Sequence, residues 1–251
     1  VSFKTKVLLG CSLALVAGYT DSVSIVQHKA YASMMTGNLI QFSRFAVSPD
    51  GWEREGGEVL PDAVFIGALI LCNMLGVIVF HMAEHLHKYG TTIISPVGAV
   101  VIGLMELAAY MDWGISSRLQ LYPLTFIFGI QNAMSLVGVV GAPTTQCTGH
   151  LGNLAGALQK ILAGKRGEAF NAKNGLSLAI VLFFMLGCIA GVFAVGAAKG
   201  TPMDDFLLLP ATVALAMLMV TDDLLSTEPD KPEPEKAGDA TALILTGVAG
   251  A

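Results

Sequence analysis

Six segments of this chain are as long and as apolar as a membrane-spanning helix needs to be. A span takes roughly 20 mostly apolar residues, because the hydrocarbon core of a bilayer is about 30 Å thick. Lipid offers no hydrogen-bond partner to exposed backbone, so open sheets are excluded within these segments. The predicted fold class is an all-α polytopic membrane protein with six clear transmembrane helices, at residues 7–27, 62–82, 92–111, 119–141, 175–198 and 205–221.

The composition agrees with a membrane location. Charged residues make up 13% of the chain and hydrophobic residues 54%, whereas a soluble domain carries about 25% charged residues. This composition argues against a soluble enzyme, a disordered chain or a disulfide scaffold. We therefore expect an integral, multi-pass protein whose first partner is the lipid bilayer.

The acidic excess lies near the C-terminal end. Residues 222–239 contain seven acids and two lysines, which accounts for the whole net charge of −5. No basic patch remains to attract a phosphate backbone, so nucleic-acid binding is excluded. We expect a single helical membrane domain over residues 1–221 and an acidic disordered tail over 222–251. The apolar patch Thr241–Val248 in that tail is too short to cross a bilayer.

Two further segments, 30–47 and 144–163, are apolar but carry Thr, Asn, Gln and one basic residue each. They are either re-entrant helices or full spans whose polar faces point away from lipid. Loop charges compare the two topologies, because Lys and Arg favour the cytoplasmic side. Six spans place seven basic residues inside and five outside, whereas eight spans place nine inside and three outside. Hydropathy favours six spans and the charges favour eight, so both remain open.

The two polar segments belong to an internal two-fold repeat, with halves at about 7–111 and 119–221. Residues 32–39 and 144–151 share the core Thr-Gly-polar-Leu, and this match sets the register of the repeat. The other pairs of nearly the same register are Gly18–Asp21 with Gly129–Asn132, and Leu75–Gly76 with Leu186–Gly187. Six spans make the halves inverted and eight make them parallel, and both patterns occur in transporters with substrate sites near the repeat interface.

Two carboxylates are candidates for chemistry. Asp21 closes the first apolar segment and Glu106 lies within the third. Burying a carboxylate in lipid costs at least about 2.5–3.5 kcal/mol, so such a residue usually has a partner or a function. Either one is a candidate ligand for a proton or a cation. The structural alternatives are that Asp21 caps the following segment and that Glu106 is hydrogen-bonded to a neighbouring helix.

Polar side chains within the apolar segments complete the candidate site. Amides at such positions either join helices by hydrogen bonds or line a polar cavity. The Thr-Gly segments either pack helices or line a central site as a symmetric pair. The residues predicted to line a substrate or ion site, besides the two carboxylates, are Thr36, Asn38, Asn73, Gln131, Asn132, Thr148 and His150.

Small residues at helix-packing spacing occur in two places, Gly152-xxx-Gly156 and Gly187-xxx-Gly191, and both predict close helix contacts. A cluster of His81, Glu84, His85 and His87 is interpreted as a polar helix end and not as a metal site. We find no enzyme motif and expect no cofactor, no metal and no catalysis.

Four motifs resemble the YoaK family of membrane proteins, a family of unknown function. They are the segments Ala17–Asp21, Ala32–Asn38, Gly129–Ala133 and Thr144–Gly149, and their order and spacing match that family over most of residues 10–220. Gln146, Cys147 and His150 depart from its pattern, and the charged segment 48–61 and the acidic tail look like additions. The resemblance implies an integral membrane protein with about six spans, and it brings no established substrate or reaction.

The leading functional hypothesis is a small secondary transporter or permease-like protein for a small molecule or an ion. The second is a non-catalytic membrane scaffold or sensor, whose polar segments only pack helices. An intramembrane enzyme acting on lipid ranks last, because only the histidine cluster resembles a reactive centre. Self-association and the particular membrane are left open.

Overall fold

The computed structural model describes residues 1–52, 60–86, 90–111, 113, 116–145, 147–169 and 171–226, and in these residues it is helical without a strand. The all-α prediction is therefore confirmed for the described part. Short 3-10 turns lie at Pro49–Trp52, Ser117–Gln120 and Pro202–Phe206. The α-helices are α1 (Phe3–His28), α2 (Met35–Val47), α3 (Asp62–Leu86), α4 (Gly90–Tyr110), α5 (Leu121–Val137), α6 (Cys147–Leu162), α7 (Arg166–Ala169), α8 (Ala172–Ala198) and α9 (Leu209–Ser226).

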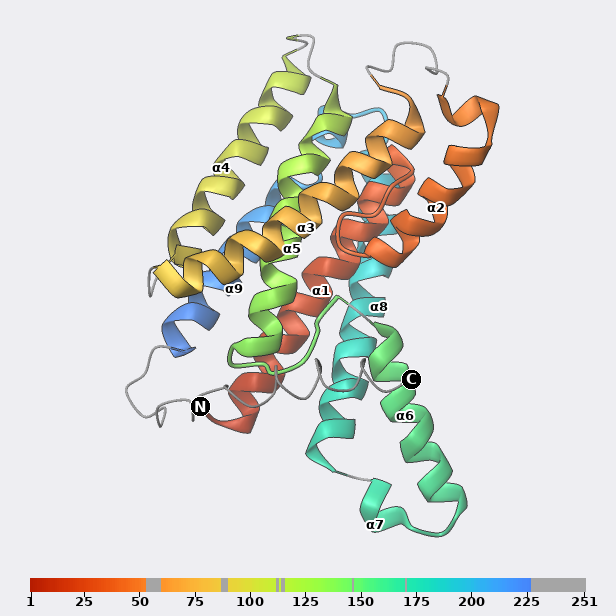
Figure 1. Cartoon of the computed structure of the whole chain (residues 1–251), viewed down its shortest axis with the longest axis vertical. Coiled ribbons are helices and arrows are strands. Elements are labelled where there is room, and N and C mark those ends of the chain that lie inside the picture. Colours follow the sequence, from red (N-terminus) through yellow and green to blue (C-terminus); the bar gives the residue numbers. More distant parts are fainter. Residues whose placement is uncertain are drawn as a thin grey trace, which may run out of the picture.

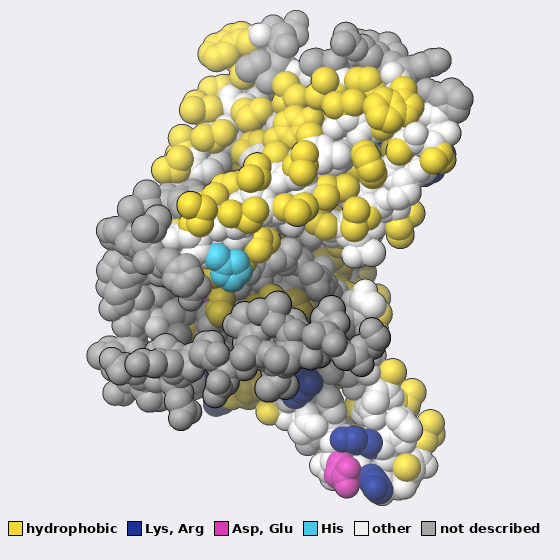
Figure 2. Space-filling model, in the orientation of Figure 1, with side chains coloured by type: hydrophobic (Ala, Val, Ile, Leu, Met, Phe, Trp, Pro, Cys, Tyr) yellow, Lys and Arg dark blue, Asp and Glu magenta, His cyan; other side chains and the backbone are white. Residues whose placement is uncertain are grey.

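Among the described residues, four helices are long and apolar enough to cross a membrane: α1, α3, α8 and α9. Each of the six predicted segments contains a helix. In the described part of the chain, only these four helices meet the length and composition of a membrane span. The apolar helix described in α4 is the shorter stretch Pro96–Tyr110, and α5 has 17 residues. Large apolar side chains cover much of the visible surface of the bundle (Figure 2), as expected of a protein that faces lipid.

The long helices form a bundle in which direction alternates along the chain (Figure 1). In that view α1, α4 and α8 run upward from the end that carries the N-terminus, and α3, α5 and α9 run downward. The principal contacts join α1 to α8, α3 to α5, and α4 to α9. The first two of these pairs are parallel and the third is antiparallel.

Glycines set the closest approaches between these helices. A Cβ atom on any of four glycines would collide with a backbone carbonyl oxygen of the neighbouring helix, so only glycine allows the observed distance between the helices. Two such contacts occur in each of two helix pairs, and the residues of one pair are separated from the corresponding residues of the other by the same number of positions in the sequence. The contacts are Gly18 with Phe184 and Gly187 with Leu15 between α1 and α8, and Gly129 with Asn73 and Gly76 with Phe126 between α5 and α3.

The two polar segments form the short helices α2 and α6, of 13 and 16 residues. At 1.5 Å per residue they are about 20 and 24 Å long, less than the thickness of a hydrocarbon core. Each begins near mid-height and returns to the end of the bundle where the preceding long helix stops (Figure 1). Helix α2 packs against α3, and α6 packs against α8.

The predicted start of the tail at residue 222 is wrong. Helix α9 continues to Ser226, and the side chain of Asp222 is fully buried and accepts a hydrogen bond from the Val139 N–H at 3.1 Å. This acid belongs to the bundle because it caps the turn that follows α5. Residues 227–251 of the predicted tail lie outside the described residues, as do the side chains of Glu84, His85 and His87 in the histidine cluster.

Candidate functional site

Asp21 is held by the turn that leads back into α2. Its Oδ1 accepts the backbone N–H of Ser33 at 2.7 Å, and its Oδ2 accepts the Ser33 hydroxyl at 2.6 Å. The backbone N–H groups of Ala32 and Met34 also hydrogen-bond to this carboxylate. The α2 N-cap residue, Met34, offers no side-chain cap of its own. Asp21 of α1 therefore holds the turn that precedes α2.

A similar bond between neutral groups ties the turn before α6 to α5. The Oδ1 of Asn132 accepts the hydroxyl of Thr145. The neighbouring Gln131 donates from Nε2 to the Thr144 hydroxyl oxygen at 2.9 Å. The turn before α6 is thus tied to α5 as the turn before α2 is tied to α1, and of the side chains of α1 and α5 in these bonds only Asp21 is titratable.

Further hydrogen bonds join each of these two returning turns to the short helix that follows it, α2 or α6. Asn38 accepts the Tyr31 N–H at 2.9 Å and donates to the Tyr31 carbonyl at 2.7 Å. At the turn before α6, the Nε2 of His150 lies 2.6 Å from the Pro143 carbonyl oxygen. Proline has no backbone N–H, so a side chain that binds Pro143 needs only to donate to its carbonyl, and the His150 ring can do this through Nε2–H. Both side chains are buried and hold the backbone of a turn.

The other ring nitrogen of His150 connects α6 to α8. Nδ1 lies 3.0 Å from the Ser177 hydroxyl oxygen, which also accepts from Asn153 at 3.1 Å. With Nε2–H donating to Pro143, the neutral ring accepts the Ser177 hydroxyl proton at Nδ1. The carbonyl of Pro143 and the amide of Asn153 therefore fix which group donates and which accepts in this row of hydrogen bonds.

The first turns of α2 and α6 each follow a turn that is bonded to the preceding long helix. Ser33 bonds to Asp21 of α1, and Thr145 bonds to Asn132 of α5. Helix N-termini carry partial positive charge and free N–H groups. Thr36 and Thr148, one in each first turn, are both exposed, whereas the carboxylate of Asp21 is buried.

Two predicted site residues lie elsewhere. Glu106 of α4 is fully buried and accepts the Leu208 N–H at 3.1 Å, just before α9 begins. Asn73 donates to the Thr125 carbonyl at 3.3 Å and joins α3 to α5. Both contacts are of the structural kind that the sequence left open. They are not part of the arrangement around Asp21 that involves the first turns of α2 and α6.

Sequence reasoning missed the partners of these residues. Ser33 and Thr145 were treated as helix-face residues, and Ser177 was not singled out. A signal was available in the sequence, because Asp21 and Asn132 are each followed 12 or 13 positions later by a Ser or a Thr. A buried ion pair at the upper end of the bundle was also missed, between Arg118 and Asp62 at 2.5 Å.

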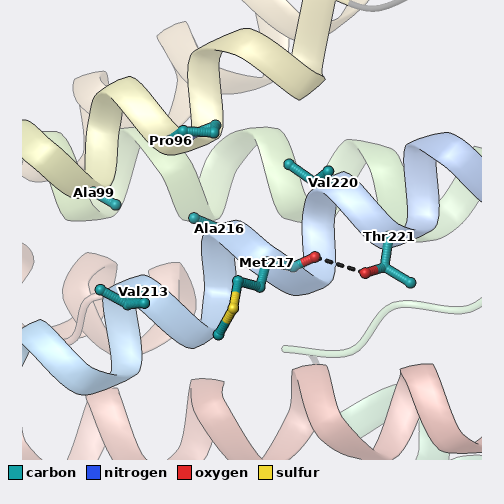
Figure 3. Close-up of a pocket in the computed structure, with 7 residues that line it drawn as sticks. All are labelled: Pro96, Ala99, Val213, Ala216, Met217, Val220 and Thr221. Atoms are coloured by element: carbon teal, nitrogen blue, oxygen red, sulfur yellow. Dashed lines mark hydrogen bonds between the residues drawn. The ribbon is translucent and has the colours of Figure 1, made fainter.

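An apolar groove of about 500 Å³ lies between α4 and α9 (Figure 3). The single hydroxyl in its lining, on Thr221, donates to the Met217 carbonyl at 2.8 Å, which leaves the hydroxyl only as an acceptor. The groove offers mainly hydrocarbon contact, so it suits lipid chains better than a polar solute. Its lining residues are Pro96, Ala99, Val213, Ala216, Met217, Val220 and Thr221.

Comparison with known families gives a match over most of the chain. The model of the family described as "Protein of unknown function (DUF1275)" matches residues 9–221. The chain belongs to the DUF1275 family. The YoaK-like proteins that its motifs resemble are members of the same family, so the resemblance is confirmed. No curated protein and no solved structure matches this chain.

The matched residues of this DUF1275 protein include both returning turns and all six long helices up to Thr221. Membership supports a membrane protein and carries no reaction, substrate or partner. The function must therefore be argued from the geometry around Asp21 and Asn132.

Proposed function

We propose that this DUF1275 protein is a small secondary transporter for a polar or ionic solute, built from two inverted halves, α1–α4 and α5–α9. In this proposal the six long helices all cross the membrane, and α2 and α6 enter and leave on the same side. The observation that carries the proposal is the recurrence of one set of contacts in both halves, with the helices running in opposite directions.

The recurrence is detailed. The glycine-to-carbonyl contacts of α1 with α8 return between α5 and α3, with all four residues shifted by the same interval. The bond of Asp21 to Ser33 returns as that of Asn132 to Thr145, and the bond of Asn38 to Tyr31 returns as that of His150 to Pro143. Because the helices of the second half run the opposite way in Figure 1, a two-fold axis in the membrane plane relates the halves.

Inverted halves with interrupted helices are a recurrent design of transporters. Their substrates bind near the middle of the membrane, where the N-termini of half-helices meet the solute. Here the first turns of α2 and α6 take that place, and the exposed hydroxyls of Thr36 and Thr148 lie on them. Irregular backbone at membrane depth is tolerated where it is buried in protein or lines a cavity.

Asp21 would couple the first half to a proton or a cation. The side chain of Asp21 only accepts hydrogen bonds, from the N–H and the hydroxyl of Ser33 and from the N–H groups of the residues beside Ser33. Protonation removes the charge that strengthens these hydrogen bonds and turns one acceptor oxygen into a donor, so the hold of Asp21 on the turn before α2 would weaken. Asn132 cannot titrate, so the bond between α5 and the turn before α6 would not respond in this way. If Asp21→Asn and Glu106→Gln both leave every detectable transport activity intact, this coupling is wrong.

The second candidate is a non-catalytic scaffold or sensor, and two observations favour it. The glycine contacts make the interfaces of α1 with α8 and α3 with α5 dry and tight. The hydrogen bonds of Asp21, Asn38 and His150 are explained by the structure of the turns alone. A scaffold needs no water at the first turns of α2 and α6, whereas a transporter does.

Thiol accessibility distinguishes the two functions. Thr36→Cys and Thr148→Cys would be made separately in a chain whose four native cysteines, all free, are replaced. We expect a water-soluble thiol reagent to modify both in membrane vesicles, because only a hydrated thiol forms the reactive thiolate. The controls are Leu71→Cys on α3 and Leu186→Cys on α8, both more than half exposed on apolar surface.

We expect the threonine positions to react at least about tenfold faster than the leucine positions, because thiolate formation is suppressed in apolar surroundings. Equal rates at all four positions would contradict a hydrated path and would support the scaffold.

A further inference from the structure

The distal half of α6, α7 and the first turn of α8 form a lobe that projects from one end of the bundle (Figure 1). We call this lobe, residues 156–175, the basic lobe. Its described lysines are Lys160, Lys165 and Lys173, and Glu168 is its one acid, 4.0 Å from Lys160. Hydrophobic and basic side chains lie side by side on it in Figure 2.

The basic lobe exposes apolar surface that nothing in the described structure covers. Leu158 is 56% exposed and Leu162 is 80% exposed. A Cβ placed on Gly152 or Gly156 would meet no atom within 4 Å, unlike the glycines that bring the long helices together. Exposed apolar side chains next to lysines match a partner that carries both acidic and apolar side chains.

The segment that follows α9 has that chemistry. Residues 227–251 carry five acids and two lysines, followed by the apolar run Ala242-Leu243-Ile244-Leu245. Helix α9 ends at Ser226, at the same end of the bundle as the lobe (Figure 1). The acids are Glu228, Asp230, Glu233, Glu235 and Asp239.

We propose that the segment 227–248 folds back onto the basic lobe. Its acids pair with Lys165 and Lys173, and Leu243 with its neighbours covers Leu158 and Leu162. The stretch between Ser226 and Leu243 reaches up to about 56 Å when extended, more than twice the length of α6. A tethered segment of this length acts at a local concentration in the millimolar range.

Docking would restrain the helix that leads to the second returning turn. The lobe joins α6 to α8, and His150 and Asn153 of α6 are bonded to Ser177 of α8 just above it. A segment held across the lobe therefore limits the separation of α6 from α8. This inference rests on the lobe and the acidic segment and stands whether or not the protein transports a solute.

Two other occupants of the lobe are conceivable on chemical grounds, an anionic lipid surface and a second copy of the chain. The acidic segment is favoured because the remainder of the chain balances acids and bases, so that the segment and the end of α9 hold the whole net charge of −5. Opposite charges that are covalently linked on one side of a bundle meet more often than separate molecules do.

Disulfide cross-linking in the full chain tests the docking. The pair Leu158→Cys with Leu243→Cys would be placed in a chain lacking the native cysteines, in nanodiscs of zwitterionic lipid, and oxidised. The control pair is Leu39→Cys with Leu243→Cys. Leu39 is 50% exposed, and it lies on α2, which runs toward the end of the bundle opposite the lobe. We expect the first pair to form an intramolecular disulfide at least about tenfold faster than the control.

Charge variants separate docking from chance collision. Lys165→Glu with Lys173→Glu should lower the rate of the Leu158–Leu243 disulfide, and adding Glu233→Lys with Glu235→Lys should restore it. Three results would overturn the proposal: equal rates for the two pairs, a disulfide that forms only between two chains, or loss of the disulfide in nanodiscs of anionic lipid. The second would assign the lobe to another copy, and the third to lipid headgroups.

Discussion

Gly187→Ala is expected to destabilise the protein by at least about 3 kcal/mol, at the upper end of the cost of overpacking. A Cβ at this position collides with the Leu15 carbonyl oxygen and approaches the Tyr19 backbone nitrogen. Backbone cannot rotate away as a side chain can, so α1 and α8 must separate along their whole contact. The measurement is the midpoint of thermal unfolding in detergent, together with the fraction of monodisperse protein.

Gly196→Ala is the matched control, because it lies in the same helix and a Cβ there meets nothing within 4 Å. We expect it to be neutral or to stabilise by up to about 1 kcal/mol, since alanine is the better helix former. Gly76→Ala in α3 should behave as Gly187→Ala does, because its Cβ meets the Phe126 carbonyl oxygen in the equivalent way. Equal midpoints for Gly187→Ala and Gly196→Ala would contradict the tight helix contact.

Asp21→Ala is expected to cost about 3 kcal/mol or more, because it leaves buried donors of the turn at Ser33 without an acceptor, and each hydrogen bond to a charged group contributes about 1.5–3 kcal/mol. Asp21→Asn should cost about 1 kcal/mol, because Oδ1 can still accept and the Ser33 hydroxyl can turn to accept from the amide. The unfolding midpoints of the two variants check this order.

Protonation of Asp21 is expected to loosen the turn before α2, because it removes the charge that strengthens the hydrogen bonds from Ser33. The thiolate fraction of any cysteine falls with pH, so the response is measured as the rate of Thr36→Cys divided by the rate of the same cysteine in the Asp21→Asn background. We expect this ratio to rise several-fold as pH falls, because residue 21 has no proton to gain in that background. A ratio that stays constant with pH would contradict a role of Asp21 in the response.

Much of the fold follows from hydropathy alone, and the exceptions have physical causes. Helices were predicted at all six long segments and are present at all six. The boundary at 222 failed because an acid in an apolar helix looks like the start of a polar tail. Asp222 is instead buried against the Val139 N–H, and no local pattern announces a bond to a residue so far back in the chain.

The two glycine motifs show that their spacing alone does not predict a close contact between helices. Gly187-xxx-Gly191 packs against α1 as predicted, whereas a Cβ on Gly152 or Gly156 meets open space. The spacing is the same in both, and the difference lies in whether a long helix runs alongside. The sequence match of Gly18–Asp21 with Gly129–Asn132 was more informative, because it pairs Asp21 with Asn132 before any contact is known.

The candidate site could be predicted as a set of residues but not as an arrangement. Asp21 is predicted as a functional carboxylate or as a cap of the next segment, and in the structure it accepts hydrogen bonds from the turn before α2. Asn38 and His150 are predicted to line a site, and in the structure their side chains bond to the turns before α2 and α6. Side chains that close a returning turn cannot be told from side chains that face a ligand until the path of the backbone is known.

The central claim is that α2 and α6 return to the side they came from. Single cysteines at Ser48, after α2, and Lys165, after α6, would be labelled in intact cells with a membrane-impermeant thiol reagent, in a chain lacking the native cysteines. Labelling at one position only, with the other reacting after the membrane is opened, is the result that six spans and inverted halves predict. Labelling of both positions from the same side would mean that α2 and α6 cross the membrane, and it would contradict the inverted repeat.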